Sequence, residues 1–177
     1  MGPSEQARRL FFALGLSAED KQHINHWLSR HVSLSKAPTQ RRNWHLTLMF
    51  LGQVEHTQAQ QLIDGARKLV VPHFSTTLDE YDYWPHNGIF HLRPSAPAPG
   101  LLNLAGELKT LARQQQIVDQ HARYRPHVTL ARNLKKPPTV DSPITPLQLE
   151  IDHFTLYHST RDDQGLVYLP LAEFACR

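Results

Sequence analysis

Two histidine-containing tetrapeptides are the residues of this sequence best suited to chemistry. They are HLTL at 45–48 and HVTL at 127–130, and their histidines lie 82 positions apart in a chain of 177 residues. An imidazole titrates near neutrality, so one ring can accept a proton while another donates one. Two rings on opposite sides of one phosphate would supply the acid and the base of an in-line displacement. His45 and His127 are therefore candidates for phosphoester chemistry that needs neither a metal nor a protein nucleophile.

Each motif also offers a hydroxyl group beside its imidazole. Side chains two positions apart in a strand point to the same face. His45 and Thr47 would then share one face, as would His127 and Thr129, while the alternate apolar residues enter the core. We expect the two threonines, with an arginine, to hold the non-bridging phosphate oxygens, where fixed donors stabilise developing charge.

His-x-Thr alone is weak evidence, because the sequence contains four such pairs. For one isolated motif, a strand histidine hydrogen-bonded to its neighbours is the better explanation. The context separates HLTL and HVTL from the other two pairs, since each follows a predicted helix and a basic loop. The loops contain Arg41-Arg42 before the first motif, and Arg123 and Arg125 before the second. His153 lies in an acidic setting without that context, and we interpret it as an ordinary strand residue.

The elements that would position the motifs follow from hydrophobic periodicity and from turn residues. A buried strand is predicted at 10–14, and a helix with Ser17 as its N-cap follows. The first motif begins a strand that should end at Gly52, and Thr57-x-x-Gln60 resembles a capping box for the next helix. The remaining predictions are strands at 75–83 and 89–92 around an Asn-Gly turn, a helix from Gly100, and strands at 147–157 and 166–171.

Strand, helix, basic loop and His-x-Thr strand occur in this order once from Leu10 and again from Ile89. The two halves share little residue-by-residue identity, so the repeat is one of architecture. It predicts two similar lobes, each of which contributes one motif. We expect a single domain, 1–177, because the chain is long enough for one well-buried core.

Composition and charge narrow the class of protein. Apolar residues make up 40% of the chain, charged residues 20%, and the net charge is +3. This describes a globular protein whose modest basic excess suits a small or single-stranded anionic partner. No run approaches the ~18 apolar residues of a membrane helix, so no membrane is expected as a partner. The single cysteine, Cys176, favours a reducing, cytoplasmic location.

Other candidates have simpler explanations. His23 and His26 have helical spacing that could chelate a metal, but no carboxylate or cysteine accompanies them, so no metal site is predicted. Four aromatic residues could stack on a nucleobase, although packing is the more common role: Trp44, Tyr83, Trp84 and Tyr124. No glycine-rich phosphate loop is present, so no nucleotide cofactor is indicated.

Taken together, these residues resemble the two-histidine (2H) phosphoesterases, and most closely the bacterial RNA 2′,3′-cyclic phosphodiesterases, also described as 2′-5′ RNA ligases. The supporting stretches cover nearly the whole chain: RLFFAL at 9–14, HLTLMFLG at 45–52, RPHVTLAR at 125–132 and FTLY at 154–157. The resemblance implies an α+β fold of two lobes with a pseudo-twofold repeat. It also implies two mainly antiparallel sheets that flank a central cleft, with helices outside.

The resemblance further implies hydrolysis of a 2′,3′-cyclic phosphate at an RNA end to a 2′-phosphomonoester. By this analogy His45 donates a proton to the leaving 3′ oxygen and His127 accepts one from water. Thr47, Thr129 and Arg132 would bind the phosphate. Strict alternation puts Arg132 on the core face, so the strand must end or bulge before it.

The alternatives stay open at this point. The same chemistry could join RNA ends through 2′-5′ linkages or cleave such linkages. From another class, the protein could bind RNA ends without turnover. RNA with a cyclic phosphate or a 2′-5′ linkage is the expected partner, no cofactor is expected, and a monomer is expected.

Overall fold

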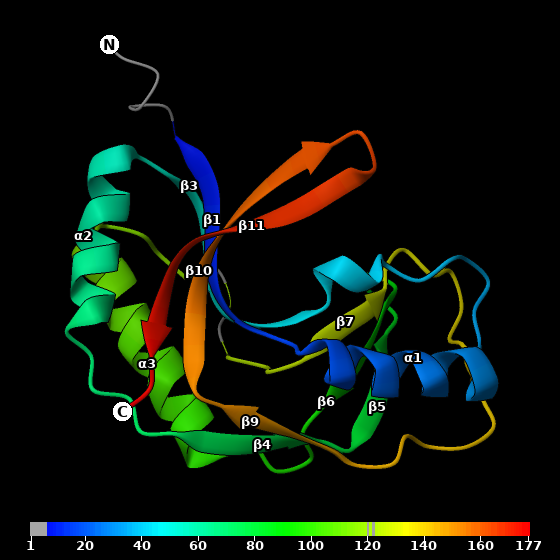
Figure 1. Cartoon of the computed structure of the whole chain (residues 1–177). Helices are drawn as coiled ribbons and strands as arrows, with labels where there is room; N and C mark the ends of the chain where they lie inside the picture. The colour runs from blue at the N-terminus through cyan, green and yellow to red at the C-terminus, as the bar shows by residue number, and fades with distance from the viewer. Residues whose placement is uncertain (1–6, 120, 122) are drawn as a thin grey trace.

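The computed structural model describes residues 7–119, 121 and 123–177, and within them it shows the predicted α+β class. Figure 1 shows how the elements are arranged. In chain order they are β1 (Arg8–Gly15), α1 (Ala18–His31), β2 (Val32–Ser33), η2 (Arg41–Asn43), β3 (His45–Val54), α2 (His56–Arg67), β4 (Phe74–Leu78), β5 (Glu80–Trp84), β6 (Ile89–Arg93), α3 (Pro99–Gln114), β7 (Val128–Ala131), β8 (Thr139–Val140), β9 (Leu147–Ile151), β10 (His153–Asp162) and β11 (Gly165–Ala175).

The main sheet has the strand order β11-β10-β1-β3-β7-β6-β5, and each pair of neighbours is antiparallel. Its two halves meet where β3 and β7 pair through Leu46 and Val128. The two lobes predicted from the sequence are thus the two halves of one sheet, β11-β10-β1-β3 and β7-β6-β5. The two His-x-Thr strands, β3 and β7, lie side by side at the junction between these halves. Their pairing joins the two expected sheets into one.

The helices lie outside the sheet, as predicted. In α1, Ser17 accepts a hydrogen bond from the backbone of Asp20, whose side chain completes a capping box. The second capping box is shifted from its predicted position, because Glu55 is the N-cap of α2 and Gln58 is its partner. Figure 1 shows α2 and α3 together beside one half of the sheet and α1 beside the other.

Two predicted strands are each divided in the structure. Residues 75–83 form most of β4 and β5, and 147–157 form β9 and part of β10. The strands β4 and β9 leave the main sheet to pair with each other. Asp79 marks the first division, where its carboxylate accepts hydrogen bonds from the backbone and hydroxyl of Ser95. The prediction that β3 ends at Gly52 is also wrong: it continues to Val54, since Gly52 adopts a positive φ of 74° that accommodates a bulge.

One hydrophobic cluster connects the two halves of the sheet with the helices. It contains residues from Leu10 near the start to Cys176 near the end. The described part of the chain has no helix with the length and apolar character to cross a membrane. The prediction of one domain, 1–177, remains a prediction, and residues 1–6, 120 and 122 lie outside the described part.

Candidate active site

The two His-x-Thr motifs meet at the junction between the two halves of the sheet. Leu46 and Val128 are register partners and are completely buried. Antiparallel register then brings His45 opposite Thr129 and, on the other side, Thr47 opposite His127. The two imidazoles occupy diagonal positions, for which Cβ atoms lie about 7–8 Å apart. All four side chains line a cleft of about 1100 Å³, so the structure brings the predicted catalytic groups together.

The backbone sets the orientation of both imidazoles in the same way. Nδ1 of His45 lies 2.7 Å from the carbonyl oxygen of Asn43, and Nδ1 of His127 lies 2.7 Å from that of Arg125. A carbonyl only accepts, so each Nδ1 carries a proton and donates it. Nε2 is therefore the nitrogen that each ring has for proton transfer. The carbonyl two residues earlier thus fixes the tautomer in both motifs.

The hydroxyl groups differ between the motifs. Oγ1 of Thr47 lies 2.7 Å from Nε2 of His45. With Nδ1 protonated and the ring neutral, the hydroxyl donates to Nε2; once the ring is charged, the Nε2 proton can be donated to the hydroxyl or to a substrate oxygen. Thr129 lines the same cleft from β7. The expectation that both threonines bind phosphate stays a prediction.

Aromatic side chains hold both rings in place. His45 packs against Phe11, with centroids 4.9 Å apart, and against the edge of Tyr168, at 5.0 Å. His127 packs edge-on against Trp84 at 4.7 Å and against His91 at 5.3 Å. Such rigid contacts keep a catalytic ring in one orientation.

Burial makes both histidines weak bases in the free protein. Desolvation lowers the pKa of His45 to about 4, and the charge of Arg132 adds to this effect, while the hydrogen bond to Asn43 opposes it. Desolvation also lowers the pKa of His127, against the hydrogen bond to Arg125 and together with Arg132. Both rings are thus neutral at neutral pH in the empty cleft.

Arg132 reaches the cleft in the way that the sequence required. Strand β7 ends at Ala131, and its pairing with β6 shifts register between Phe90 and His91. Arg132 follows as an exposed residue that lines the cleft. Its position is confirmed, and its contact with phosphate stays a prediction.

The other aromatic candidates separate into two groups. Trp84 and Tyr124 line the cleft, and the Tyr124 hydroxyl donates to the carbonyl of Thr47 at 2.8 Å. Trp44 is buried, and the Tyr83 hydroxyl donates to a backbone carbonyl at 2.6 Å. These last two residues therefore serve packing, which was the more common role expected for them.

Two histidines considered and set aside in the sequence, His23 and His153, have structural partners. His23 lies 3.0 Å from the carbonyl oxygen of Thr145, and His153 bridges Asp152 and Glu173. Across the described residues 7–119, 121 and 123–177, no cluster of three or more histidine, cysteine, aspartate or glutamate side chains is placed to hold a metal ion.

Sequence reasoning missed His91. This side chain is completely buried on β6 and is the register partner of Thr129. Its ring lies 4.0 Å from Trp84 and near His127, and its Nε2 has no hydrogen-bond partner among the described residues. His91-Leu92-Arg93 lacks the threonine of the motifs. The available signal was its place after an Asn-Gly turn, on a strand predicted to belong to the second lobe.

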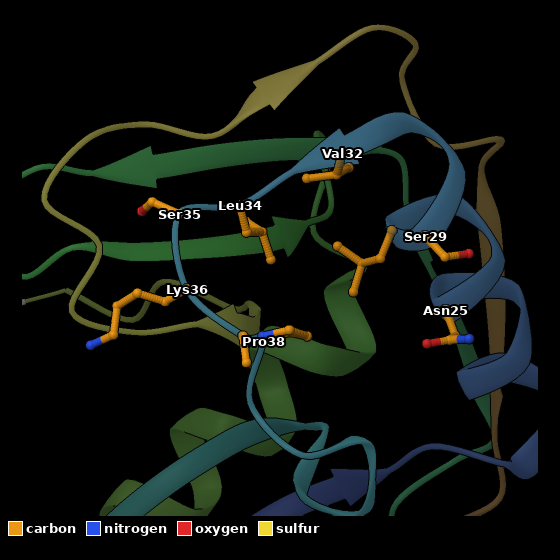
Figure 2. A pocket seen from close by; sticks show the side chains of 9 residues that line it. Asn25, Ser29, Val32, Leu34, Ser35, Lys36 and Pro38 are labelled. Atoms are coloured by element: carbon orange, nitrogen blue, oxygen red, sulfur yellow. The ribbon is translucent and has the colours of Figure 1, made fainter.

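A second hollow, of about 550 Å³, lies between α1 and the segment that follows it. Figure 2 shows Asn25 and Ser29 on the helix, and on the other side Val32, Leu34, Ser35, Lys36 and Pro38. Lys36 is the charged residue among those that line it, and neither motif reaches it. The groups suited to acid–base chemistry therefore lie in the larger cleft.

Comparison with known proteins identifies the family. A model described as the 2′-5′ RNA ligase superfamily matches residues 17–163, which is most of the chain. The chain belongs to this superfamily. The resemblance to two-histidine phosphoesterases inferred from the motifs is thereby confirmed.

Relatives in this superfamily are similar along nearly their whole length. An Escherichia coli K12 protein named RNA 2′,3′-cyclic phosphodiesterase is 32% identical over 96% of this chain and 97% of its own. A Thermotoga maritima protein of the same name is 24% identical, over 93% and 94%. The crystal structure of E. coli LigT complexed with 3′-AMP superposes with a TM-score of 0.91 at 31% identity, covering 97% of this chain and 99% of that one.

Proposed function

We propose that this protein hydrolyses 2′,3′-cyclic phosphates at RNA ends to 2′-phosphomonoesters. The observation that carries the proposal is the diagonal arrangement of two oriented imidazoles across one cleft. Membership of the 2′-5′ RNA ligase superfamily supports it, as do relatives named RNA 2′,3′-cyclic phosphodiesterase.

In the proposed mechanism, Nε2 of His127 takes a proton from a water molecule as the water oxygen attacks phosphorus. The bond from phosphorus to the 3′ oxygen breaks on the opposite side, and Nε2 of His45 donates a proton to that oxygen. Thr47, Thr129 and Arg132 hold the non-bridging oxygens, where fixed donors stabilise the charge of the transition state. The bond to the 2′ oxygen remains, so the product is a 2′-phosphomonoester. The next turnover requires a proton to return to His45 and one to leave His127.

The pKa of His45 makes the acid role depend on the substrate. At about 4 in the free protein, its pKa leaves the ring neutral near pH 7. A bound phosphodiester brings a negative charge next to the ring, which favours the imidazolium and raises the pKa. We therefore expect a bell-shaped pH dependence of kcat/KM, with its maximum below pH 6.5 because both histidine pKa values are lowered.

Joining of RNA ends is the second candidate, and the family description favours considering it. In joining, a 5′ hydroxyl takes the place of water as the nucleophile: His127 accepts its proton, His45 donates a proton to the leaving 3′ oxygen, and a 2′-5′ linkage forms. Cleavage of that linkage is the reverse step, with the protonation states of the two histidines exchanged, so one cleft serves both directions. All the proposed catalytic side chains come from one chain, so a monomer suffices. The free, buried thiol of Cys176 agrees with the cytoplasmic location proposed from the sequence.

The test is to incubate the purified protein with a 2′,3′-cyclic-phosphate-ended RNA and to identify the monoester formed. We expect the 2′-phosphate, with activity unchanged in EDTA. A 3′-phosphate product would contradict the proposed geometry, because the 2′ oxygen would then be the leaving group. Binding without turnover between pH 4 and 9 would instead favour the non-catalytic alternative.

A further inference from the structure

The cleft extends past the histidines along the half of the sheet formed by β1, β3, β10 and β11. Four residues line this extension, and we call them the outer shelf: Arg9, Phe50, Ser159 and Arg161. Phe50 is 36% exposed, which is unusual for a phenylalanine on a strand, and the guanidinium of Arg9 lies 4.9 Å above its ring. An exposed aromatic ring beside arginines is the combination that binds single-stranded nucleic acid.

A bulge in β3 brings Phe50 to the cleft. The register partners of Phe12 and Ala13 on β1 are Met49 and Thr47, so Leu48 is an extra residue. Leu48 and Met49 are therefore both buried, and the alternation changes phase. Without the bulge, Met49 would continue the face of His45 and Thr47. With it, Phe50 lies on that face, opposite Phe11, which itself contacts His45.

The β10–β11 hairpin contributes the polar part of the shelf. Ser159 pairs with Tyr168, and Arg161 pairs with Leu166, and all four residues line the cleft. The hairpin is held near its turn, because the guanidinium of Arg42 donates to both carboxylate oxygens of Asp162 at 2.9 Å. The hairpin that carries Arg161 is therefore held in position.

The charges of the cleft favour an anion longer than one phosphate. Its lining contains five arginines and one acidic residue, Asp119. That carboxylate lies 3.4 Å from His121 and 3.9 Å from Lys109, so part of its charge is offset. Arg132 is next to the histidines, while Arg9 and Arg161 extend the positive surface outward.

We propose that the outer shelf binds the nucleotide immediately 5′ to the cyclic-phosphate end, with its base on Phe50 and its phosphodiester at Arg161. This inference rests on the proposed function. The terminal nucleotide occupies the site between the histidines, and the rest of an RNA strand must leave the cleft. The shelf provides stacking and charge for that next nucleotide, so the preferred substrate is an RNA end rather than a free cyclic mononucleotide.

The experiment compares a 2′,3′-cyclic mononucleotide with the same nucleotide extended by one 5′ nucleotide. We expect kcat/KM of the parent protein to favour the dinucleotide by about tenfold, the usual size of one stacked base. Phe50→Leu and Arg161→Ala should each remove most of this preference and change mononucleotide turnover less than twofold. Arg8→Ala is the matched control, since Arg8, like Arg161, is an exposed arginine on a strand of the same half of the sheet, but it does not line the cleft.

Each outcome of this experiment either supports or contradicts binding of the 5′ nucleotide by the outer shelf. Equal losses on both substrates, no loss in either variant, or the same loss in Arg8→Ala would overturn the shelf while leaving the proposed function intact. If the parent protein hydrolyses neither substrate, the proposed function fails instead. Fluorescence titration with the 3′-phosphorylated dinucleotide and mononucleotide then measures the shelf by binding, with the same variants and the same expected ratios.

Discussion

The two half-sites share a motif and a backbone hydrogen bond, yet their surroundings differ. In the first, Oγ1 of Thr47 contacts the catalytic nitrogen of His45, and Phe11 and Tyr168 enclose the ring. In the second, His127 packs against both Trp84 and the buried His91, which also contact each other. The pKa is lowered at both, and at His45 it reaches about 4.

The repeated His-x-Thr motif therefore sets the position of each imidazole, and the side chains around it determine whether it acts as the acid or the base. A ring with a low pKa is a strong acid once it is protonated, and the negative charge of the bound substrate favours that protonation. Such an acid suits departure of an alkoxide. A ring whose Nε2 faces the cleft without a threonine contact, among the described residues, is available to a water molecule. We therefore associate His45 with the leaving group and His127 with the nucleophile.

The sharpest test of this comparison replaces each histidine by alanine. With a cyclic-phosphate RNA end, His45→Ala and His127→Ala should each lower kcat by about 10²–10⁴-fold, the usual contribution of a general acid or base. With a p-nitrophenyl phosphodiester the leaving group needs no proton, so His45→Ala should recover much of the loss and His127→Ala should not. Circular dichroism checks that both variants fold. Recovery in His127→Ala alone would reverse the assignment.

A smaller effect is expected from the two threonines. Thr47→Val removes both a predicted phosphate donor and the hydroxyl at Nε2 of His45, whereas Thr129→Val removes a predicted phosphate donor alone. We expect each to lower kcat/KM by about tenfold, the scale of one hydrogen bond to a charged group. Only Thr47→Val should also move the pKa of His45, measured by titrating the ring signals in NMR spectra. Equal movement in both variants would show that the hydroxyl contact does not distinguish the half-sites.

Much of the site could be predicted because it depends on local periodicity. Alternation in a strand places His45 beside Thr47 and His127 beside Thr129, and the order of elements predicts that two lobes contribute them. Strict alternation puts Arg132 on the core face, which predicted that the strand ends or bulges before this residue. Strand β7 does end at Ala131.

The rest depends on contacts between distant segments, which strict alternation does not contain. The bulge at Leu48 changes the phase of β3 and brings Phe50 to the cleft, and no local pattern in HLTLMFLG indicates it. The divisions of 75–83 and 147–157 arise because β4 and β9 pair with each other. His91 joins the site only through the pairing of β6 with β7.

The smallest predicted effect concerns the half-site that contains His91. Desolvation lowers its pKa to about 4, so the folded protein holds it neutral while the unfolded chain binds a proton near pH 6.5. The stability that comes from keeping this ring neutral is present above pH 6.5 and is lost as the pH falls toward 4, because protons then favour the unfolded state.

His91→Phe removes the titrating group and the unpartnered Nε2 while keeping a ring against Trp84. Its melting temperature should therefore fall less than that of the parent between pH 7 and pH 4.5. Leu92→Val, a buried substitution on β6 that removes no titrating group, is the control and should lower the melting temperature without changing its slope with pH. A parallel fall in His91→Phe and the parent would contradict this prediction and would show that the acid sensitivity resides in other groups whose pKa is lowered, such as His45 and His127.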